Sequence, residues 1–256
     1  MSYLLGFICV LALGVIGCSE TVGTGGLGGE GGSGGSGGAG GGKERAQLTI
    51  YLVDWDPTAP GAGIVGPLPG VKVCEFNTTN CEVTDDTGFA FLQMPTEQEV
   101  MVTVEKDGYG SLLGSEVVSA DGSAFTSFAP KTDVRLGEQY ERVMSPYPMA
   151  EGTGAIALTI NGLVEVNEPG ATFELIGNGG KAYYRDANKD WSLDLTATST
   201  DGVGGFVEVT PGEYQIRVGG TAENCVVWRG WLSDLPNTVR VPVREGLTSV
   251  LRMNCD

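Results

Sequence analysis

Hydrophobic and polar residues alternate over short runs along most of the chain. Gln47–Val53, Val100–Val104 and Tyr214–Val218 each place apolar residues at alternate positions. Because successive side chains of a strand point to opposite faces, this spacing predicts half-buried β-strands. Helical periodicity is nearly absent, and Asp133–Met144 is interpreted as a short helix or as a strand with an irregular end. The pattern therefore predicts an all-β protein.

Turn signals separate these runs at intervals of about eight to twelve residues. Each is a glycine preceded by proline or aspartate: Pro69-Gly70, Asp107-Gly108, Pro169-Gly170, Asp201-Gly202 and Pro211-Gly212. Glycine supplies the positive φ that a tight reversal needs. A proline before the glycine fixes its own φ at the value that the preceding turn position requires. Short strands joined by such turns are typical of antiparallel β-sandwiches.

The N-terminal segment has a different character. Leu4–Gly17 is an apolar run of about fifteen residues, which is too short to cross a hydrocarbon core of about 30 Å but typical of a secretory signal. Residues 21–42 are mostly glycine, with serine, threonine and alanine, and glycine loses the most backbone entropy on ordering. We expect a signal peptide over 1–17 and a disordered, flexible linker over 18–45.

The remainder contains one β pattern twice. In the first copy, Pro69–Val73 leads to a Thr-Asp turn and an aromatic strand at 84–91. In the second copy, Pro169–Phe173 leads to a similar turn and strand at 200–207. A repeated turn–strand–turn order predicts two tandem antiparallel β-sandwich domains, over 46–148 and 149–256.

Both copies resemble the carboxypeptidase regulatory-like domain. The first copy fits the family pattern from Gly70 to Tyr109, whereas the second keeps Thr198, Gly205-Phe206 and Pro211–Tyr214. The second copy departs from the pattern by a long insertion over 177–194 and by the loss of the closing Gly-Tyr. The resemblance implies transthyretin-like or immunoglobulin-like β-sandwiches, and such domains rarely carry chemistry themselves.

A second resemblance concerns Cys18. The ending Val15-Ile16-Gly17-Cys18 is similar to a bacterial lipobox, although the three residues at the start include no Lys or Arg. The resemblance implies that Cys18 is lipidated and becomes the first residue of the mature protein. The alternative is that the apolar run is an ordinary signal peptide or a weak membrane span. Ser19 implies export to the outer membrane of a Gram-negative bacterium, facing the periplasm or the outside.

Charge and composition narrow the function. The formal net charge of −17 argues against nucleic-acid binding, which needs basic surfaces, so we expect attachment to the membrane through the N-terminal lipid. The chain has no histidine, which removes the Ser-His and Cys-His pairs and the usual zinc sites. Carboxylate pairs remain open, but no groove marks them out. We therefore expect no enzyme.

Four cysteines are expected in the exported domains, since Cys9 leaves with the signal peptide and Cys18 takes the lipid. Four cysteines allow three disulfide connectivities. We favour Cys74–Cys81 and Cys225–Cys255, because each pair then closes within one predicted domain. The spacing does not fit the alternative, a zinc site.

An acidic loop is the candidate cation site. We expect no cofactor apart from a structural calcium ion at this loop. Asp186, Asn188 and Asp190 place oxygen ligands at alternate positions, and Asp194 follows, as at the start of a calcium loop. The EF-hand pattern then fails, since Trp191 takes the place of the turn glycine. The residues are interpreted as a weak structural calcium site or as an exposed polar loop.

Three tryptophans are the candidate contacts for a glycan or a partner: Trp191, Trp228 and Trp231. Flat aromatic rings stack on sugars, but they also fill sandwich cores. The sequence as a whole predicts a lipid-anchored, non-catalytic protein of the cell envelope that presents β-sandwich modules to an envelope protein. The alternative is a carbohydrate-binding or adhesion lipoprotein that uses calcium.

Overall fold

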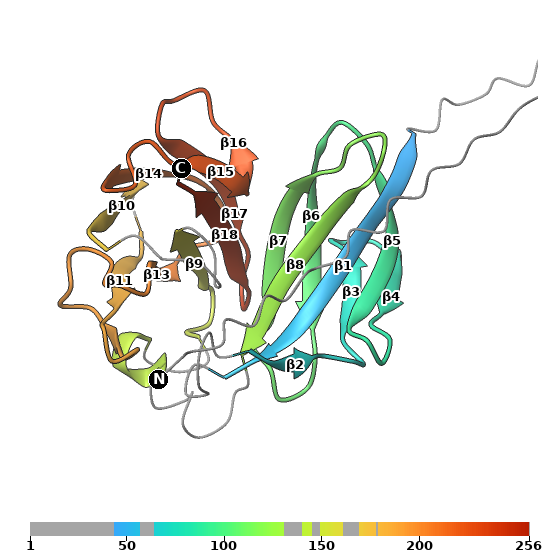
Figure 1. Cartoon of the computed structure of the whole chain (residues 1–256), viewed down its shortest axis with the longest axis horizontal. Helices are drawn as coiled ribbons and strands as arrows, with labels where there is room; N and C mark the ends of the chain where they lie inside the picture. Colours follow the sequence, from blue (N-terminus) through green and yellow to red (C-terminus); the bar gives the residue numbers. More distant parts are fainter. Residues whose placement is uncertain are drawn as a thin grey trace, which may run out of the picture. The chain divides into compact units, whose positions relative to one another are not determined.

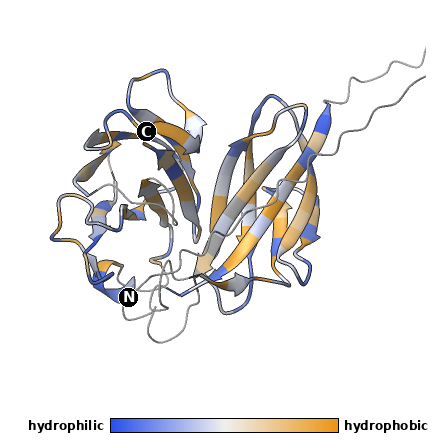
Figure 2. Cartoon of the chain, in the orientation of Figure 1, coloured by the Kyte–Doolittle hydropathy of each residue, from blue (hydrophilic) through white to orange (hydrophobic). Residues whose placement is uncertain are grey.

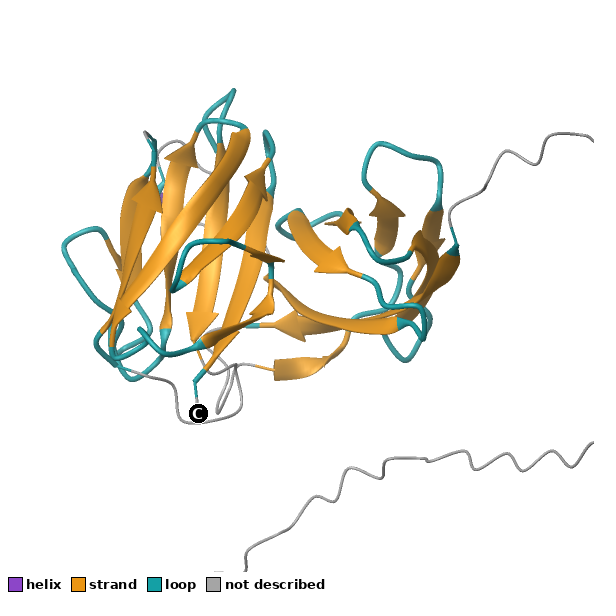
Figure 3. Cartoon of the chain, turned by 90° about the horizontal axis from the view of Figure 1, so that it is seen from above, coloured by secondary structure: helices purple, strands orange, loops and turns teal. Residues whose placement is uncertain are grey.

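The computed structural model describes residues 44–56, 64–130, 140–144, 149–160, 169–177 and 179–255. These residues are almost entirely strand and loop, with a helical turn at 140–143 (Figure 3). The all-β prediction is confirmed. Of the segment 133–144, expected to be a short helix or an irregular strand, residues 140–143 form that turn and 133–139 lie outside the described residues. The expected signal peptide, Cys18 and the glycine linker lie outside the described residues. Residues 42–256 form one compact unit.

The first repeat comprises residues 45–130 and contains eight strands (Figure 1): β1 (Arg45–Trp55), β2 (Ile64–Pro67), β3 (Lys72–Glu75), β4 (Cys81–Val83), β5 (Phe89–Pro95), β6 (Glu99–Glu105), β7 (Leu112–Val117) and β8 (Ser123–Pro130). Strand β1 pairs with β2 and β5 antiparallel and with β8 parallel. The other sheet runs β4-β3-β6-β7. Alternate side chains of β1, including Leu48 and Ile50, fill the core between the two sheets.

The second repeat comprises residues 154–254 and contains ten strands: β9 (Gly154–Ile160), β10 (Ala171–Ile176), β11 (Lys181–Arg185), β12 (Trp191–Ser192), β13 (Val203–Val209), β14 (Gly212–Gly220), β15 (Val226–Arg229), β16 (Trp231–Leu232), β17 (Thr238–Val243) and β18 (Thr248–Asn254). One sheet runs β10-β14-β17-β16, and the other β12-β11-β13-β9-β18 with β15 paired to β18. Many strands in both repeats alternate between hydrophobic and hydrophilic positions, as the periodicity predicts (Figure 2).

The two repeats share one strand order. The first-repeat strands β5-β1-β8 correspond to β13-β9-β18, and β3-β6-β7 correspond to β10-β14-β17, each set with the same pairing directions. In each repeat, the threonine before the Asp-containing turn accepts the same kind of backbone hydrogen bond. The Val71 N–H donates to Oγ1 of Thr84 at 2.9 Å, and the Ala171 N–H donates to Oγ1 of Thr198 at 3.0 Å. Thr198, and not Thr200, therefore takes the place of Thr84.

One sheet contains strands from both repeats. Strand β18 pairs in parallel with β7 at Thr248–Val250, while its other neighbour is β9. The resulting ten-stranded sheet runs from β12 to β4, with β15 as a side branch. The boundary expected at 148/149 adjoins residues outside the described ranges and stays a prediction.

Both favoured disulfides are present. Cys74–Cys81 joins β3 to β4, and Cys225–Cys255 joins the residue before β15 to the residue after β18. Within the described ranges, no helix has the length and the apolar character to cross a membrane.

Candidate functional site

A pocket lies where the first repeat meets the sheet β11-β13-β9-β18. On β9, Ile156, Leu158 and Ile160 point into the core of the second repeat, whereas Ala155, Ala157 and Thr159 line the pocket on the opposite face. Trp55, at the end of β1, covers this face from the first repeat. The small alanines on one strand and a large ring on another thus leave a cavity of about 110 Å³.

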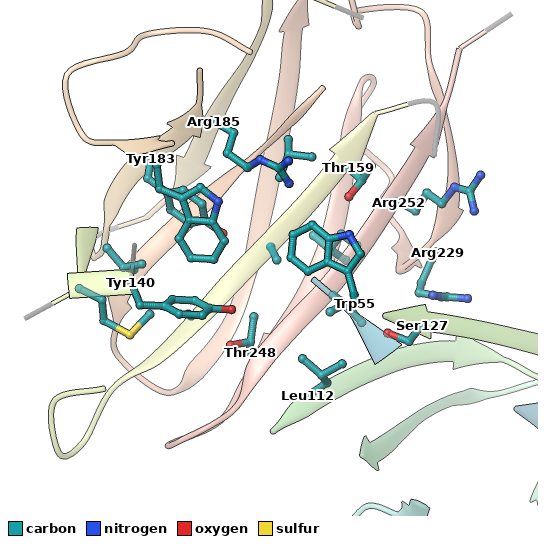
Figure 4. A pocket seen from close by; sticks show the side chains of 18 residues that line it. Trp55, Leu112, Ser127, Tyr140, Thr159, Tyr183, Arg185, Arg229, Thr248 and Arg252 are labelled. Atoms are coloured by element: carbon teal, nitrogen blue, oxygen red, sulfur yellow. The ribbon is translucent and has the colours of Figure 1, made fainter. Parts of the chain in front are cut away.

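Aromatic, hydroxyl and arginine side chains dominate the wall of this inter-repeat pocket. Figure 4 shows Tyr140, Tyr183 and Trp55 around the hollow, with Arg185 on one side and Arg229 and Arg252 on the other. The aliphatic hydroxyl groups come from Ser127 of β8, Thr159 of β9 and Thr248 of β18. The polar side chains of the pocket are therefore able to donate hydrogen bonds.

Arg185 is the most deeply buried charge in the pocket, with a residue exposure of 2%. Its Nε lies 2.5 Å from Oδ2 of Asp201, and its guanidinium lies 5.2 Å from the centre of the Trp55 ring. Burial lowers the pKa of Arg185, against the opposing effect of Asp201. Burial likewise raises the pKa of Asp201, with Arg185 opposing that shift. The pair thus holds a cation beside an aromatic ring in a buried site.

Two residues that line the pocket carry a buried donor for which the described residues provide no hydrogen-bond acceptor. These donors are Nη1 of Arg185 and the indole Nε1 of Trp191. Burial raises the pKa of the neighbouring Tyr183 hydroxyl, which stays protonated and donates to the carbonyl oxygen of Ile156 at 3.5 Å. Buried polar groups normally find partners, so these two N–H groups mark the pocket as a place for an acceptor.

Arg229 connects the pocket to the first repeat. Its Nε donates to Oε1 of Glu116 at 2.9 Å, and its guanidinium lies 4.0 Å from the centre of the Phe125 ring. Burial lowers the pKa of Arg229 and raises that of Glu116, while each partner opposes the shift of the other. Gly114 of β7 allows this packing, because a Cβ there would lie 2.3 Å from Cε2 of Phe125.

The structure separates the three tryptophans. Trp191 is 6% exposed and packs against Tyr140 and Tyr183, whose ring centres lie 4.2 and 5.3 Å away. Trp231 is 4% exposed, beneath the guanidinium of Arg240 at 5.5 Å. Of the two alternatives for these rings, surface contact and core packing, Trp191 and Trp231 follow core packing, since both are buried. Trp228 is 47% exposed and remains a surface candidate, with Arg252 at 4.0 Å from its ring centre.

Trp228 belongs to a group of exposed apolar side chains that we call the β15–β16 surface. It is defined by Val226, Trp228, Leu232 and Leu235, of which Leu232 is 73% exposed. Val226 and Trp228 are both exposed on β15, whose pairing with β18 shifts register between Val227 and Arg229. The sequence singled out Trp228 but not the aliphatic residues, although the tract from Val226 to Leu235 is rich in apolar residues.

The acidic loop forms the turn between β11 and β12. Oδ1 of Asp186 accepts the N–H groups of Asn188 and Asp190, each at 2.8 Å, and Oδ1 of Asp190 lies 3.1 Å from Nη1 of Arg142. The N–H of Asp194 donates to Oγ of Ser192 at 3.1 Å. Across the described ranges no group of three or more His, Cys, Asp or Glu side chains is placed to hold a metal ion. The calcium site stays a prediction.

No protein-family model matches this chain, and no curated protein matches it. Among solved structures, it is similar to the Bacillus anthracis TIE protein at 14% identity and a TM-score of 0.25, over 83% of this chain and 34% of that one. A minor pilin of Streptococcus agalactiae is 13% identical with a TM-score of 0.25, over 82% of this chain and 96% of the pilin. The shaft pilin SpaA from Lactobacillus rhamnosus GG is 11% identical with a TM-score of 0.24, over 83% and 98%. The description of the fold rests on the strand pairing of the chain itself.

Proposed function

We propose that this chain is a lipid-anchored, non-catalytic protein of the cell envelope whose β-sandwich repeats bind a protein partner. The observation that carries the proposal is the β15–β16 surface, where four large apolar side chains are exposed within ten residues of chain. Contiguous exposed apolar patches are typical of interaction surfaces, whereas single exposed apolar residues need no explanation, and we propose that these four side chains form such a patch.

The sequence supports the anchor and the location. The lipobox-like ending at Cys18 provides the lipid, and the glycine-rich segment provides a flexible tether that keeps the repeats away from the bilayer. Within this proposal the protein is attached to the outer membrane of a Gram-negative bacterium. The motif match from Gly70 to Tyr109 supports the assignment of the repeats to the carboxypeptidase regulatory-like type.

The residues of the β15–β16 surface favour a protein over a glycan. Sugar recognition by stacking uses flat rings, and of the three tryptophans considered only Trp228 presents one. The other members, Val226, Leu232 and Leu235, are aliphatic and suit the apolar centre of a protein–protein interface.

The partner can be identified by cross-linking mass spectrometry on native membranes that carry the tagged full-length protein. We expect a recurrent, near-stoichiometric protein partner that is lost in Trp228→Ala and Leu232→Ser. Val83→Ser is the matched control, because Val83 is also exposed but lies on β4 of the first repeat. Absence of a protein partner, or equal cross-linking in all variants, would overturn the proposal. Binding to envelope polysaccharide that Trp228→Ala abolishes would instead support the glycan alternative.

The anchor is tested separately with Cys18→Ser. We expect the wild-type protein to incorporate an alkyne-labelled fatty acid and to sediment with outer membranes. The variant should lose the label and appear in the soluble fraction. Membrane attachment that persists in the unlabelled variant would contradict lipid anchoring at Cys18.

A further inference from the structure

We propose that the inter-repeat pocket binds a small organic carboxylate with a flat apolar body. This activity goes beyond the proposed partner binding, since it uses the interior of the protein and not the β15–β16 surface. Three features of the pocket point to this ligand: the size of the cavity, its aromatic wall, and two buried donors that have no acceptor among the described residues.

The size of the cavity limits the ligand. About 110 Å³ is available, which is close to the engineered cavity of about 150 Å³ that binds benzene in another protein. Ala155 and Ala157 leave this space because their side chains are small. The opposite face of β9 carries the larger isoleucine and leucine side chains. A ligand of about six to nine non-hydrogen atoms fits, and a larger one does not.

The wall selects a flat apolar body. Trp55, Tyr140 and Tyr183 surround the cavity, and the aromatic faces of such side chains favour stacked or edge-on rings. Figure 4 shows the three side chains around the same hollow as Arg185.

The donors select a carboxylate. Nη1 of Arg185 and Nε1 of Trp191 are buried without an acceptor among the residues that the structure describes, and the two residues are 2% and 6% exposed. A carboxylate has two oxygens that accept such N–H groups, and hydrogen bonds to charged groups are stronger than neutral ones. A phosphate is disfavoured, because Asp201 already faces Arg185 at 2.5 Å and a second negative charge in the ligand would be repelled.

The test is a calorimetric titration of the full-length lipidated protein in detergent with sodium benzoate, and with benzyl alcohol as the neutral counterpart. We expect a sub-millimolar Kd for benzoate, and binding of benzyl alcohol at least about tenfold weaker. Arg185→Met should weaken benzoate binding by about tenfold or more, as the loss of a charge-assisted hydrogen bond predicts. Arg217→Met is the control, because Arg217 is a solvent-exposed arginine outside the pocket.

Two further variants keep the test decisive if Arg185→Met does not fold, as judged by circular dichroism. Trp191→Phe removes one donor and keeps an aromatic ring, whereas Ala157→Leu fills the cavity. Trp231→Phe is the matched control for the first, since Trp231 is equally buried, has an unpartnered Nε1 and lies outside the pocket. We expect both pocket variants to weaken benzoate binding and the control to retain it.

Three results would overturn the proposal. They are no benzoate binding by the wild type at about 10 mM, equal binding of benzoate and benzyl alcohol, and unchanged benzoate binding in the folded pocket variants. The titration uses the purified protein without a partner, so its outcome is independent of the cross-linking experiment.

Discussion

Individual glycines in this fold differ in what their surroundings permit, even at the same backbone angle. Gly88 has a φ of +81° and Gly108 a φ of +80°. A Cβ at Gly88 would lie 2.7 Å from the carbonyl oxygen of Leu52, whereas a Cβ at Gly108 meets nothing within 4 Å. The Leu52 oxygen belongs to buried backbone of β1 and cannot move aside easily.

We therefore expect Gly88→Ala to be clearly more destabilising than Gly108→Ala. Both variants carry the left-handed strain of an L-residue, about 1–2 kcal/mol. Gly88→Ala adds the cost of overpacking, about 1–3 kcal/mol. Urea denaturation of the two variants measures the difference, and equal midpoints would show that the close approach at Gly88 has no energetic weight.

Asp85 in the same turn predicts a pH effect. The Thr87 hydroxyl donates to its Oδ1 at 2.6 Å and the Phe89 N–H donates at 3.0 Å, and these bonds lower the pKa of Asp85. A carboxylate whose pKa is lower in the folded state stabilises the fold fully when the pH is above its ordinary pKa of 3.8. This contribution is lost as the pH falls through the pKa of the folded state. Thr87→Ala should raise the pKa of Asp85 towards 3.8 in an NMR titration. Thr78→Ala, in another turn, should leave it unchanged, and an unshifted Asp85 in Thr87→Ala would contradict this assignment.

Sequence predicted the turn residues well but not the direction of each tryptophan. Of the glycines in the five turn signals, Gly70, Gly108, Gly170 and Gly202 are at positive φ, whereas Gly212 begins β14 and is not. Trp228 is exposed and Trp231 is buried; they lie in different strands, since Gly230, at a φ of +123°, separates β15 from β16. Arg185 could not be foreseen as a pocket residue, since its neighbour Trp55 is distant in sequence and comes from the other repeat.

At the scale of elements, the equivalent threonines connect the strand after each Pro-Gly turn to the segment before the next strand. Thr84 and Thr198 are buried, and each accepts a backbone N–H through its hydroxyl. Replacement by valine keeps the shape but leaves that N–H unsatisfied, which costs about 1–3 kcal/mol. We expect Thr84→Val and Thr198→Val to lower the free energy of unfolding by this amount, and the serine variants to retain most of the stability. Serine variants as unstable as the valine variants would mean that methyl packing, not the hydroxyl, decides the effect.

Strands with long alternation were predictable, and their partners across the repeats were not. The expected runs at 47–53, 100–104 and 214–218 lie within β1, β6 and β14. Strands β12 and β16 have two residues each, which is too short for a periodic signal. The parallel pairing of β7 with β18 joins residues more than 130 positions apart, and neither strand carries a local pattern that specifies the other.

At the scale of the whole molecule, β18 is the strand on which both repeats depend. It pairs with β9, β7 and β15, and Cys255 ties its end to Cys225 across 30 residues. Cys74–Cys81 closes only 7 residues, within the β3–β4 hairpin at the edge of the same sheet. In the chain-entropy model the longer loop contributes roughly 3–4 kcal/mol and the shorter one roughly 2–3 kcal/mol.

Removal of each disulfide should therefore differ both in the loss of stability and in how far from the bond the structure is affected. We expect Cys225→Ala/Cys255→Ala to lower the unfolding midpoint more than Cys74→Ala/Cys81→Ala. Because β18 is hydrogen-bonded to β7, the first variant should also speed amide hydrogen exchange in β7 of the other repeat, whereas the second should affect β3 and β6 and leave β9 protected. Hydrogen exchange with mass spectrometry resolves these strands. If β7 keeps its protection when the Cys225–Cys255 bond is absent, the shared sheet does not couple the stability of the two repeats.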